Sequence, residues 1–278
     1  MKKIFVATDF SEVADNAINY AAGLARVFDA SLTLVHVYES PVLYTAEIPY
    51  TAIEAAEKLS ESEAQSNMSK LFEKVIKQFP TLQISKIVKK GISVETIAQE
   101  ADDNGADLLV SGSTGAGLIE RTLIGSTTTA LINKSKCMML IVPHNAVFKG
   151  INSLVYTTDL RDDNILFANK LLPIAKQLNA ELVFLFVDNK IHTDSEQITE
   201  EMSSKIRNMV SYPKLSGYVC TDPDVMNGIS LFIRKMKSEM VAMLTHPRSF
   251  PQMLWDKSIT KKFSYHPDVP LLILHAAS

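Results

Sequence analysis

The chain repeats itself, and this repeat constrains its fold more than any other feature. Residues 4–37 and 154–187 align without a gap at an offset of 150, and each begins with an apolar run ending in Thr-Asp. The ends of the two halves align at an offset of 132, so the second copy is 18 residues shorter in its middle. We expect two tandem domains, residues 1–146 and 150–278, which suits a chain of 278 residues.

Each half alternates between strand-like and helix-like apolar periods. Strands are expected near 3–8, 31–38, 82–89, 106–111 and 137–142, with helices at 11–28, 53–78, 93–104 and 118–134. In the second half, strands are expected near 153–158, 181–187, 215–220, 239–244 and 270–274. This alternation predicts an α/β fold of two tandem, open, mostly parallel five-stranded sheets wrapped by helices. A ligand crevice is expected beyond the carboxyl ends of the strands.

Composition excludes several classes of protein. A net charge of −3 argues against a nucleic-acid binder that relies on a strong phosphate-attracting field, while a local basic patch stays open. No apolar run approaches the length of a membrane span. The first nine residues reach Asp9 too soon for a signal peptide. Two cysteines give no disulfide framework, so we expect a cytoplasmic protein. The six histidines are scattered, and no zinc or other metal site is expected.

The most informative stretch is rich in glycine and hydroxyl residues and covers residues 111–128. Glycine lets the backbone approach a ligand closely, and backbone N–H groups beside a helix start bind anions. No lysine follows these glycines as a P-loop requires, and Glu120 stands where a Rossmann fingerprint needs its third glycine. The stretch therefore favours a phosphate site of another kind. The plainer alternative is a strand-to-helix turn with Ser126 as the helix cap.

At this point the sequence resembles the universal stress protein (UspA-like) family. The spacing Gly112-x2-Gly115-x9-Gly125-Ser126 is similar to that family's nucleotide-binding pattern. The first strand ending in Thr-Asp and the second ending in Val-His-Val fit as well, although Met138 stands where proline is common. The resemblance covers nearly the whole chain, once per half. It implies a tandem universal stress protein with a Rossmann-like, adenine nucleotide alpha hydrolase-like fold.

The resemblance also implies a ligand and its contacts. The first half would bind ATP or another adenine nucleotide, with or without Mg²⁺. The residues implied as nucleotide-binding are Ala7, Asp9, Val37, Gly112, Ser113, Gly115, Gly125, Ser126 and Thr127. For Asp9 an alternative has equal weight, namely a cap of the following helix with Glu12 three residues later.

The second half has lost this loop. Its matching residues are Leu244 for Gly112, Pro247 for Gly115 and Lys257 for Gly125. Proline lacks an N–H donor, so a phosphate cradle of the same kind is not expected there. We expect one nucleotide per chain, with a structural role for the second half.

The resemblance further implies an intrachain pseudo-dimer, in which residues 270–274 pair with 137–142, and a homodimer of whole chains. We expect a regulatory protein of the stress response with an unidentified protein partner. Two alternatives stay open. One is a weak ATPase or phosphate-transfer enzyme, limited because Asp9 is the one obvious carboxylate in the predicted site. The other is an interaction module without nucleotide. Residues 38–52 are expected to form a loop over the crevice mouth.

Overall fold

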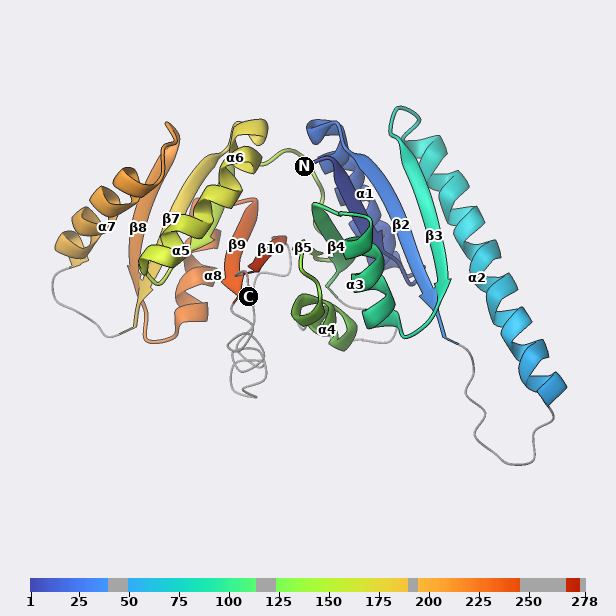
Figure 1. Cartoon of the computed structure of the whole chain (residues 1–278). Coiled ribbons are helices and arrows are strands. Elements are labelled where there is room, and N and C mark those ends of the chain that lie inside the picture. Colours follow the sequence, from blue (N-terminus) through green and yellow to red (C-terminus); the bar gives the residue numbers. More distant parts are fainter. Residues whose placement is uncertain (40–49, 114–123, 190–194, 246–268, 276–278) are drawn as a thin grey trace.

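A computed structural model shows ten strands in a single sheet, ordered β3-β2-β1-β4-β5-β10-β9-β6-β7-β8 (Figure 1). The structure describes residues 1–39, 50–113, 124–189, 195–245 and 269–275. The predicted crevice loop at 38–52 lies largely outside them. The alternation of strands with helices, predicted from the apolar periods, is confirmed as a mostly parallel α/β architecture.

The first half contributes the order β3-β2-β1-β4-β5 with all neighbours parallel. Its strands are β1 (Lys3–Ala7), β2 (Ser31–Tyr38), β3 (Ile84–Lys90), β4 (Leu108–Gly112) and β5 (Met138–Val142). Its helices are α1 (Glu12–Phe28), α2 (Tyr50–Gln78), α3 (Ser93–Asp103) and α4 (Ser126–Lys134). A helix was predicted over 118–134; residues 118–123 lie outside the described part of the chain.

The second half repeats this order as β8-β7-β6-β9-β10. Its strands are β6 (Ser153–Thr157), β7 (Glu181–Asp188), β8 (Leu215–Thr221), β9 (Met240–Thr245) and β10 (Leu271–His275). Its helical segments are α5 (Asp162–Phe167), η1 (Ala168–Leu171), α6 (Leu172–Leu178), α7 (Ser195–Met209) and α8 (Val225–Met236).

The halves meet at an antiparallel strand pair. β10 pairs with β5 in the register Leu272 to Leu140, which confirms the pairing predicted for 270–274 and 137–142. A connection at residues 143–152 leads from β5 to β6 and passes the N-terminus in Figure 1. The proposed domain bounds, 1–146 and 150–278, fall within this connection and stay a prediction.

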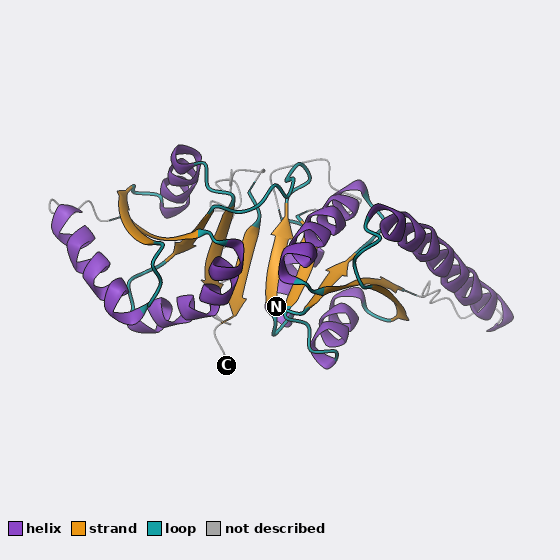
Figure 2. Ribbon diagram, turned by 90° about the horizontal axis from the view of Figure 1, so that it is seen from above, coloured by secondary structure: helices purple, strands orange, loops and turns teal. Residues whose placement is uncertain are grey.

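Helices cover both faces of the sheet, as the view from above shows (Figure 2). One apolar core lies between the sheet and the helices α1, α2, α6 and α7, and runs through both halves. The other lies on the opposite face, against α3, α4 and α8. Each core gathers every second residue of a strand, as the period of two requires: Ile4 and Val6 on one face, Phe5 and Ala7 on the other. Within the described residues, no helix is long and apolar enough to cross a membrane.

The repeat extends to the rarest backbone conformations. Phe10 and Leu160 both have φ near +64°, and they are related by the offset of 150. Asp29 and Asn179 follow at the same offset, with φ of 48° and 55°, each ending a helix in the left-handed region. Left-handed conformations are costly for residues other than glycine. Their recurrence at equivalent positions therefore supports a duplication of one unit.

A second shared device holds the start of each half. The Asp107 carboxylate accepts hydrogen bonds from the backbone N–H groups of Lys2 and Lys3, at 2.5 and 3.0 Å. Glu239, related to Asp107 by the offset of 132, accepts from the N–H groups of Asn152 and Ser153 at 3.1 and 2.8 Å. Each carboxylate ties the residues entering the first strand of its half to the segment before the fourth.

The helix after the first strand differs between the halves. α1 is continuous over 17 residues, whereas its counterpart is divided into α5, a 3-10 turn and α6. Pro173 lies in the first turn of α6, at the position equivalent to Gly23. Proline has no N–H and collides with the carbonyl of the preceding turn, so a continuous helix is not available there.

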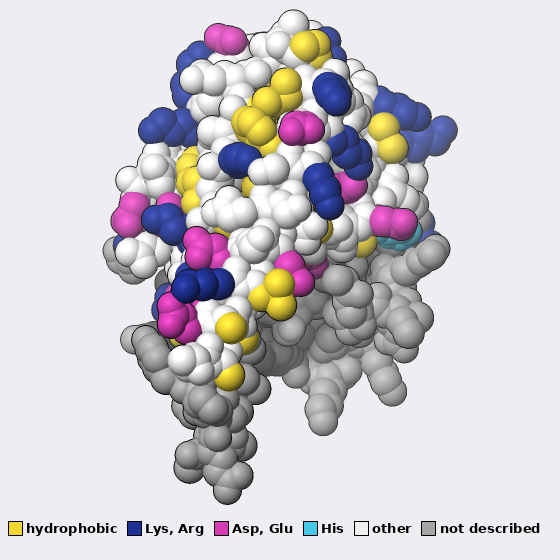
Figure 3. All heavy atoms as spheres, turned by 90° about the vertical axis from the view of Figure 1, so that its right-hand side faces the viewer, with side chains coloured by type: hydrophobic (Ala, Val, Ile, Leu, Met, Phe, Trp, Pro, Cys, Tyr) yellow, Lys and Arg dark blue, Asp and Glu magenta, His cyan; other side chains and the backbone are white. Residues whose placement is uncertain are grey.

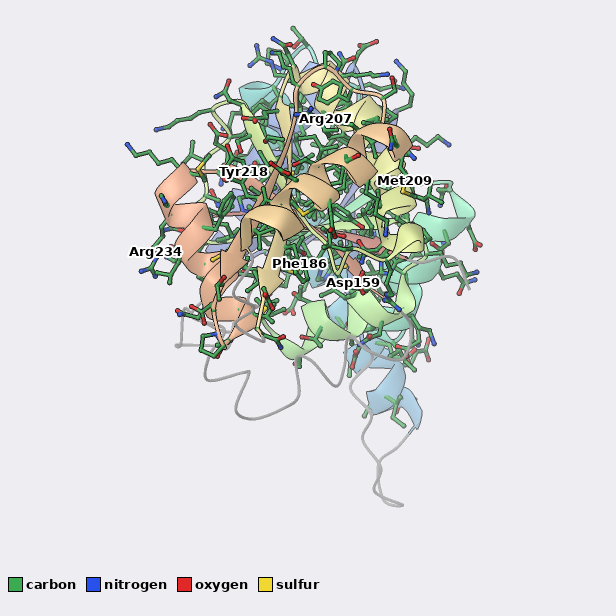
Figure 4. All side chains as sticks on the ribbon, turned by 90° about the vertical axis from the view of Figure 1, so that its left-hand side faces the viewer. Asp159, Phe186, Arg207, Met209, Tyr218 and Arg234 are labelled. Atoms are coloured by element: carbon green, nitrogen blue, oxygen red, sulfur yellow. The ribbon has the colours of Figure 1, made fainter. Side chains whose placement is uncertain are left out.

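The two outer edges of the sheet also differ. β3 carries Lys86, Lys89 and Lys90, and basic side chains are prominent on this side of the molecule (Figure 3). β8 has no charged residue within its bounds, and the partly exposed Tyr218 packs against Phe232 of α8 (Figure 4). Lysine on an edge strand discourages pairing with another chain, so the two ends of the sheet are unequally protected.

Candidate functional site

The predicted residues gather at the carboxyl edge of the first half. Ala7 ends β1 and is buried, and Val37 lies one residue before the end of β2, also buried. Gly112 ends β4, which is the neighbour of β1 on its other side. The strand order reverses between β1 and β4, and such a switch point is where open α/β sheets bind ligands. The fold thus puts these three residues at the expected end of the sheet; their contact with a ligand stays a prediction.

The turn after β1 is held by its own side chains. Thr8 Oγ1 accepts from the N–H of Phe10 at 3.1 Å, and Asp9 Oδ1 accepts from the N–H and hydroxyl of Ser11 at 3.1 and 2.5 Å. The cap of α1 is Ser11, whose hydroxyl oxygen accepts from the N–H of Ala14 at 3.2 Å. The alternative prediction that Asp9 itself caps this helix is therefore wrong. Asp9 fixes the capping residue from two positions earlier.

Gly112 is required for packing. A Cβ atom at this position would lie 2.7 Å from Cγ1 of Val13 and 3.3 Å from that residue's carbonyl oxygen. The first turn of α1 therefore rests directly on the end of β4. The carbonyl oxygen of Gly112 accepts from the buried Thr128 hydroxyl at 2.9 Å and from the Ser111 hydroxyl at 3.2 Å. Close helix–strand approach explains this glycine without any ligand.

The glycine-rich loop closes on itself at its base. The N–H of Ser113 donates to Val142 at 2.9 Å, and the N–H of Gly125 donates to the carbonyl of Ser113 at 2.7 Å. α4 begins directly afterwards, with Gly125 as an N-cap that offers no side-chain acceptor. Ser126 and Thr127 are exposed in its first turn. The predicted cap by Ser126 is thus wrong, because the cap is one residue earlier; Gly115 lies outside the described residues.

The start of α4 has the chemistry of an anion site. The first N–H groups of a helix have no partner within the helix, and the helix dipole places partial positive charge there. Hydroxyls of Ser126 and Thr127 add neutral donors at the same point. The arrangement suits a phosphate group without requiring a lysine or arginine.

Two residues beside this edge were missed in the sequence. Glu39 follows β2, and its Oε1 accepts from the hydroxyl and N–H of Ser93 at 3.1 and 3.3 Å, at the start of α3. It is a second carboxylate near the predicted site. His36 Nδ1 lies 2.8 Å from the carbonyl oxygen of Thr8, so this nitrogen carries the proton and donates, while the ring contacts Phe10 at 4.2 Å. Only the position of His36 beside Val37 pointed to the site.

The corresponding edge of the second half has the same turn after its first strand but a different residue near the end of its fourth strand. Thr158 and Asp159 repeat the bonds to Leu160 and Arg161, at 3.0 and 3.2 Å. The Asp159 carboxylate additionally pairs with the Arg161 side chain at 2.6 Å (Figure 4). β9 carries Leu244 where β4 has Gly112. Pro247 and Lys257 lie outside the described residues.

The cysteines and the metal-ligating side chains were the other candidates for chemistry. Burial raises the pKa of the Cys137 thiol and of the Cys220 thiol, so the thiolate form of each is disfavoured at neutral pH. Within the described ranges, no three His, Cys, Asp or Glu side chains cluster so as to hold a metal ion.

A family profile, a curated relative and a solved structure all relate this chain to the same protein family. Residues 1–143 match the sequence profile described as "Universal stress protein family". A Staphylococcus epidermidis protein with a provisional universal stress protein name is 30% identical over 164 residues, covering 58% of this chain and 95% of that protein. A universal stress protein from Archaeoglobus fulgidus shares the fold over 99% of this chain and 98% of its own, with a TM-score of 0.76 and 14% identity.

A solved universal stress protein in complex with cAMP matches one half of the chain. It is 25% identical over 51% of this chain and 95% of its own, with a TM-score of 0.35. The nucleotide in that structure is a property of that protein.

Proposed function

Because the chain belongs to the universal stress protein family, we propose that its first half binds an adenine nucleotide at the carboxyl edge of β1, β2 and β4. Occupancy of this site would regulate the binding of a protein partner in a stress response, by ordering the loops around the phosphates. One nucleotide binds per chain, because the second half has Leu244 in β9 where the first half has Gly112 in β4.

One observation carries the proposal. The loop after β4 is tied at its base by the bond from Gly125 to Ser113, and the tie leaves the uncapped start of α4 at the switch point of the sheet. Phosphates would receive N–H donors from Ser126 and Thr127, while adenine and ribose would lie against the ends of β1 and β2. Any Mg²⁺ would arrive with the phosphates.

Ser126→Pro tests this placement most sharply. Proline is favoured at the first position of a helix, and the backbone of Gly125 (φ −63°, ψ 156°) already has the conformation that a following proline requires. The substitution therefore removes one N–H donor and one hydroxyl while α4 keeps its start. Ser126→Ala is the matched control, because it removes the hydroxyl alone.

Titration calorimetry with Mg-ATP, AMP and cAMP gives the readout. We expect Ser126→Pro to weaken ATP binding about tenfold or more and Ser126→Ala about threefold or less, because charge-assisted hydrogen bonds contribute about 1.5–3 kcal/mol. If Ser126→Pro binds ATP with unchanged affinity, the phosphates do not bind at the start of α4. Native mass spectrometry of the purified protein checks the count of one nucleotide per chain.

A further inference from the structure

A separate groove lies along α1, on the face opposite α3 and α4. It has a volume of about 630 Å³ and is bounded by α1, the residues that end α2, and the connection between the halves. On α1 it extends from Asn16 to Val27, which at about 1.5 Å per residue is roughly 16 Å. This size is in the range of pockets for small organic ligands.

The wall formed by the connection is fixed in place. The side-chain amide of Asn16 donates to the carbonyl oxygens of Pro143 and Ala146 at 2.8 and 2.9 Å. The ring of Phe148 meets that of Tyr20 edge to face at 5.3 Å and leaves no space for a Cβ at Gly23. The groove is therefore built by specific contacts of this chain.

The Tyr20 side chain forms part of the groove wall. Tyr20 is only 3% exposed, yet it lines the groove, so its accessible part lies there. Within the described part of the chain, its hydroxyl makes no hydrogen bond. Burial raises the pKa of this phenol above its ordinary value, and the Glu239 carboxylate raises it further. Tyr20 thus stays protonated at neutral pH and keeps a hydroxyl proton that it can donate.

The rim supplies a cation and an apolar wall. Arg26 lines the groove from the last turn of α1, and no carboxylate of the described residues forms an ion pair with it. Phe79 and Phe148 line the same groove, and Val147 is 66% exposed beside them. An apolar surface with one cation and one buried donor complements a flat ligand with an acidic group.

We propose that this groove binds a small aromatic carboxylate whose acidic group pairs with Arg26, whose body lies against Phe79 and Phe148, and whose far end accepts a hydrogen bond from Tyr20. The site is distinct from the nucleotide crevice, because it lies along the body of α1 rather than at the turn before it. Its wall is the connection between the halves, so an occupant contacts the joint of the molecule.

Two fluorescent probes test the site, 2-naphthoate and 6-hydroxy-2-naphthoate, which differ only in a hydroxyl opposite the carboxylate. We expect saturable binding of one probe per chain, with the hydroxylated probe preferred severalfold. Arg26→Gln should weaken both probes about fivefold, as loss of a partly exposed ion pair implies. Tyr20→Phe should abolish the preference for the hydroxylated probe and leave 2-naphthoate unaffected.

The repeat provides a matched control. Lys176 occupies the position of Arg26 in the second half, is also exposed and does not line the groove, so Lys176→Gln makes the same change of charge at a side chain outside it. Its probe affinities should equal those of the unmodified protein, and saturating ATP should not displace either probe. The proposal is overturned by absence of saturable binding, by equal effects of the Arg26 and Lys176 variants, by a preference that survives Tyr20→Phe, or by displacement with ATP.

Discussion

The first half has Gly112 at the end of β4, and the second half has Leu244 at the equivalent position, one residue before the end of β9. The turns that follow β1 and β6 are nevertheless the same. In each of them an aspartate, Asp9 or Asp159, accepts a hydrogen bond from the backbone N–H two residues later. An aspartate at this position is therefore explained by the turn in both halves and does not by itself indicate a ligand. The two halves differ at the next strand end of this edge, where Leu244 replaces Gly112.

The largest expected effect comes from copying the second half into the first. In Gly112→Leu the new Cβ would lie 2.7 Å from Val13 Cγ1, so the start of α1 has to move. We expect the free energy of unfolding to fall by about 2–3 kcal/mol, as for other overpacked sites, and nucleotide affinity to fall more than tenfold. Chemical denaturation and calorimetry measure the two effects. A single change in the second half, Pro247→Gly, should create no second site, because Leu244 still stands where the first half has Gly112; a second nucleotide per chain would contradict the comparison.

The paired carboxylates should be equivalent. Asp107→Ala and Glu239→Ala each remove an acceptor of two backbone N–H groups. We expect each to lower the free energy of unfolding by about 1–2 kcal/mol, measured by urea denaturation. A large loss for one and none for the other would show that the two halves are not held by the same device.

The helix caps should be unequal. Ser11→Ala removes the side-chain cap of α1 and should cost about 1 kcal/mol. Its counterpart Arg161 provides no side-chain cap to α5, and its exposed ion pair with Asp159 contributes little. Arg161→Ala should therefore cost about 0.5 kcal/mol or less. Thermal unfolding of the two variants ranks them, and equal losses would contradict the assignment of the cap.

The smallest effect is a dependence on pH at Asp107. Burial raises the pKa of this carboxyl, but the N–H groups of Lys2 and Lys3 outweigh burial and hold it below the ordinary value of 3.8. A lowered folded-state pKa means that the stabilisation is complete above the unfolded pKa and is lost as pH falls through the folded one. The stability difference between the unmodified protein and Asp107→Ala should thus be constant above about pH 5 and shrink below pH 4. If the difference in free energy of unfolding grew as the pH fell, the pKa of Asp107 in the folded protein would be raised rather than lowered.

The sequence predicted the alternation of strands and helices because buried parallel strands and amphipathic helices have distinct periods. The pairing of residues 270–274 with 137–142 was implied by the resemblance to the universal stress protein family, because an apolar run does not by itself specify its neighbour. The break of the second helix was not predicted, although Pro173 was visible, because proline is also favoured in a first helical turn. Local pattern does not distinguish these two uses.

At the site, the sequence located the edge but not the roles. Gly112 was interpreted as space for a ligand, whereas its contact with Val13 arises from packing between elements far apart in the chain. Glu39 was missed because its partner Ser93 is 54 residues away. The capping residue was misplaced by two positions, since Asp9 and Ser11 are both favoured caps and only the backbone decides between them.

The antiparallel seam between β5 and β10 has a consequence for how the halves stay matched. Two separate polypeptides meeting edge to edge would come apart on dilution, whereas halves on one polypeptide face each other at a fixed, high effective concentration. Because both halves are translated as one polypeptide, they are always present in equal numbers. The second half therefore keeps its neighbour even when its own crevice changes, and that crevice can diverge while β10 continues to pair with β5.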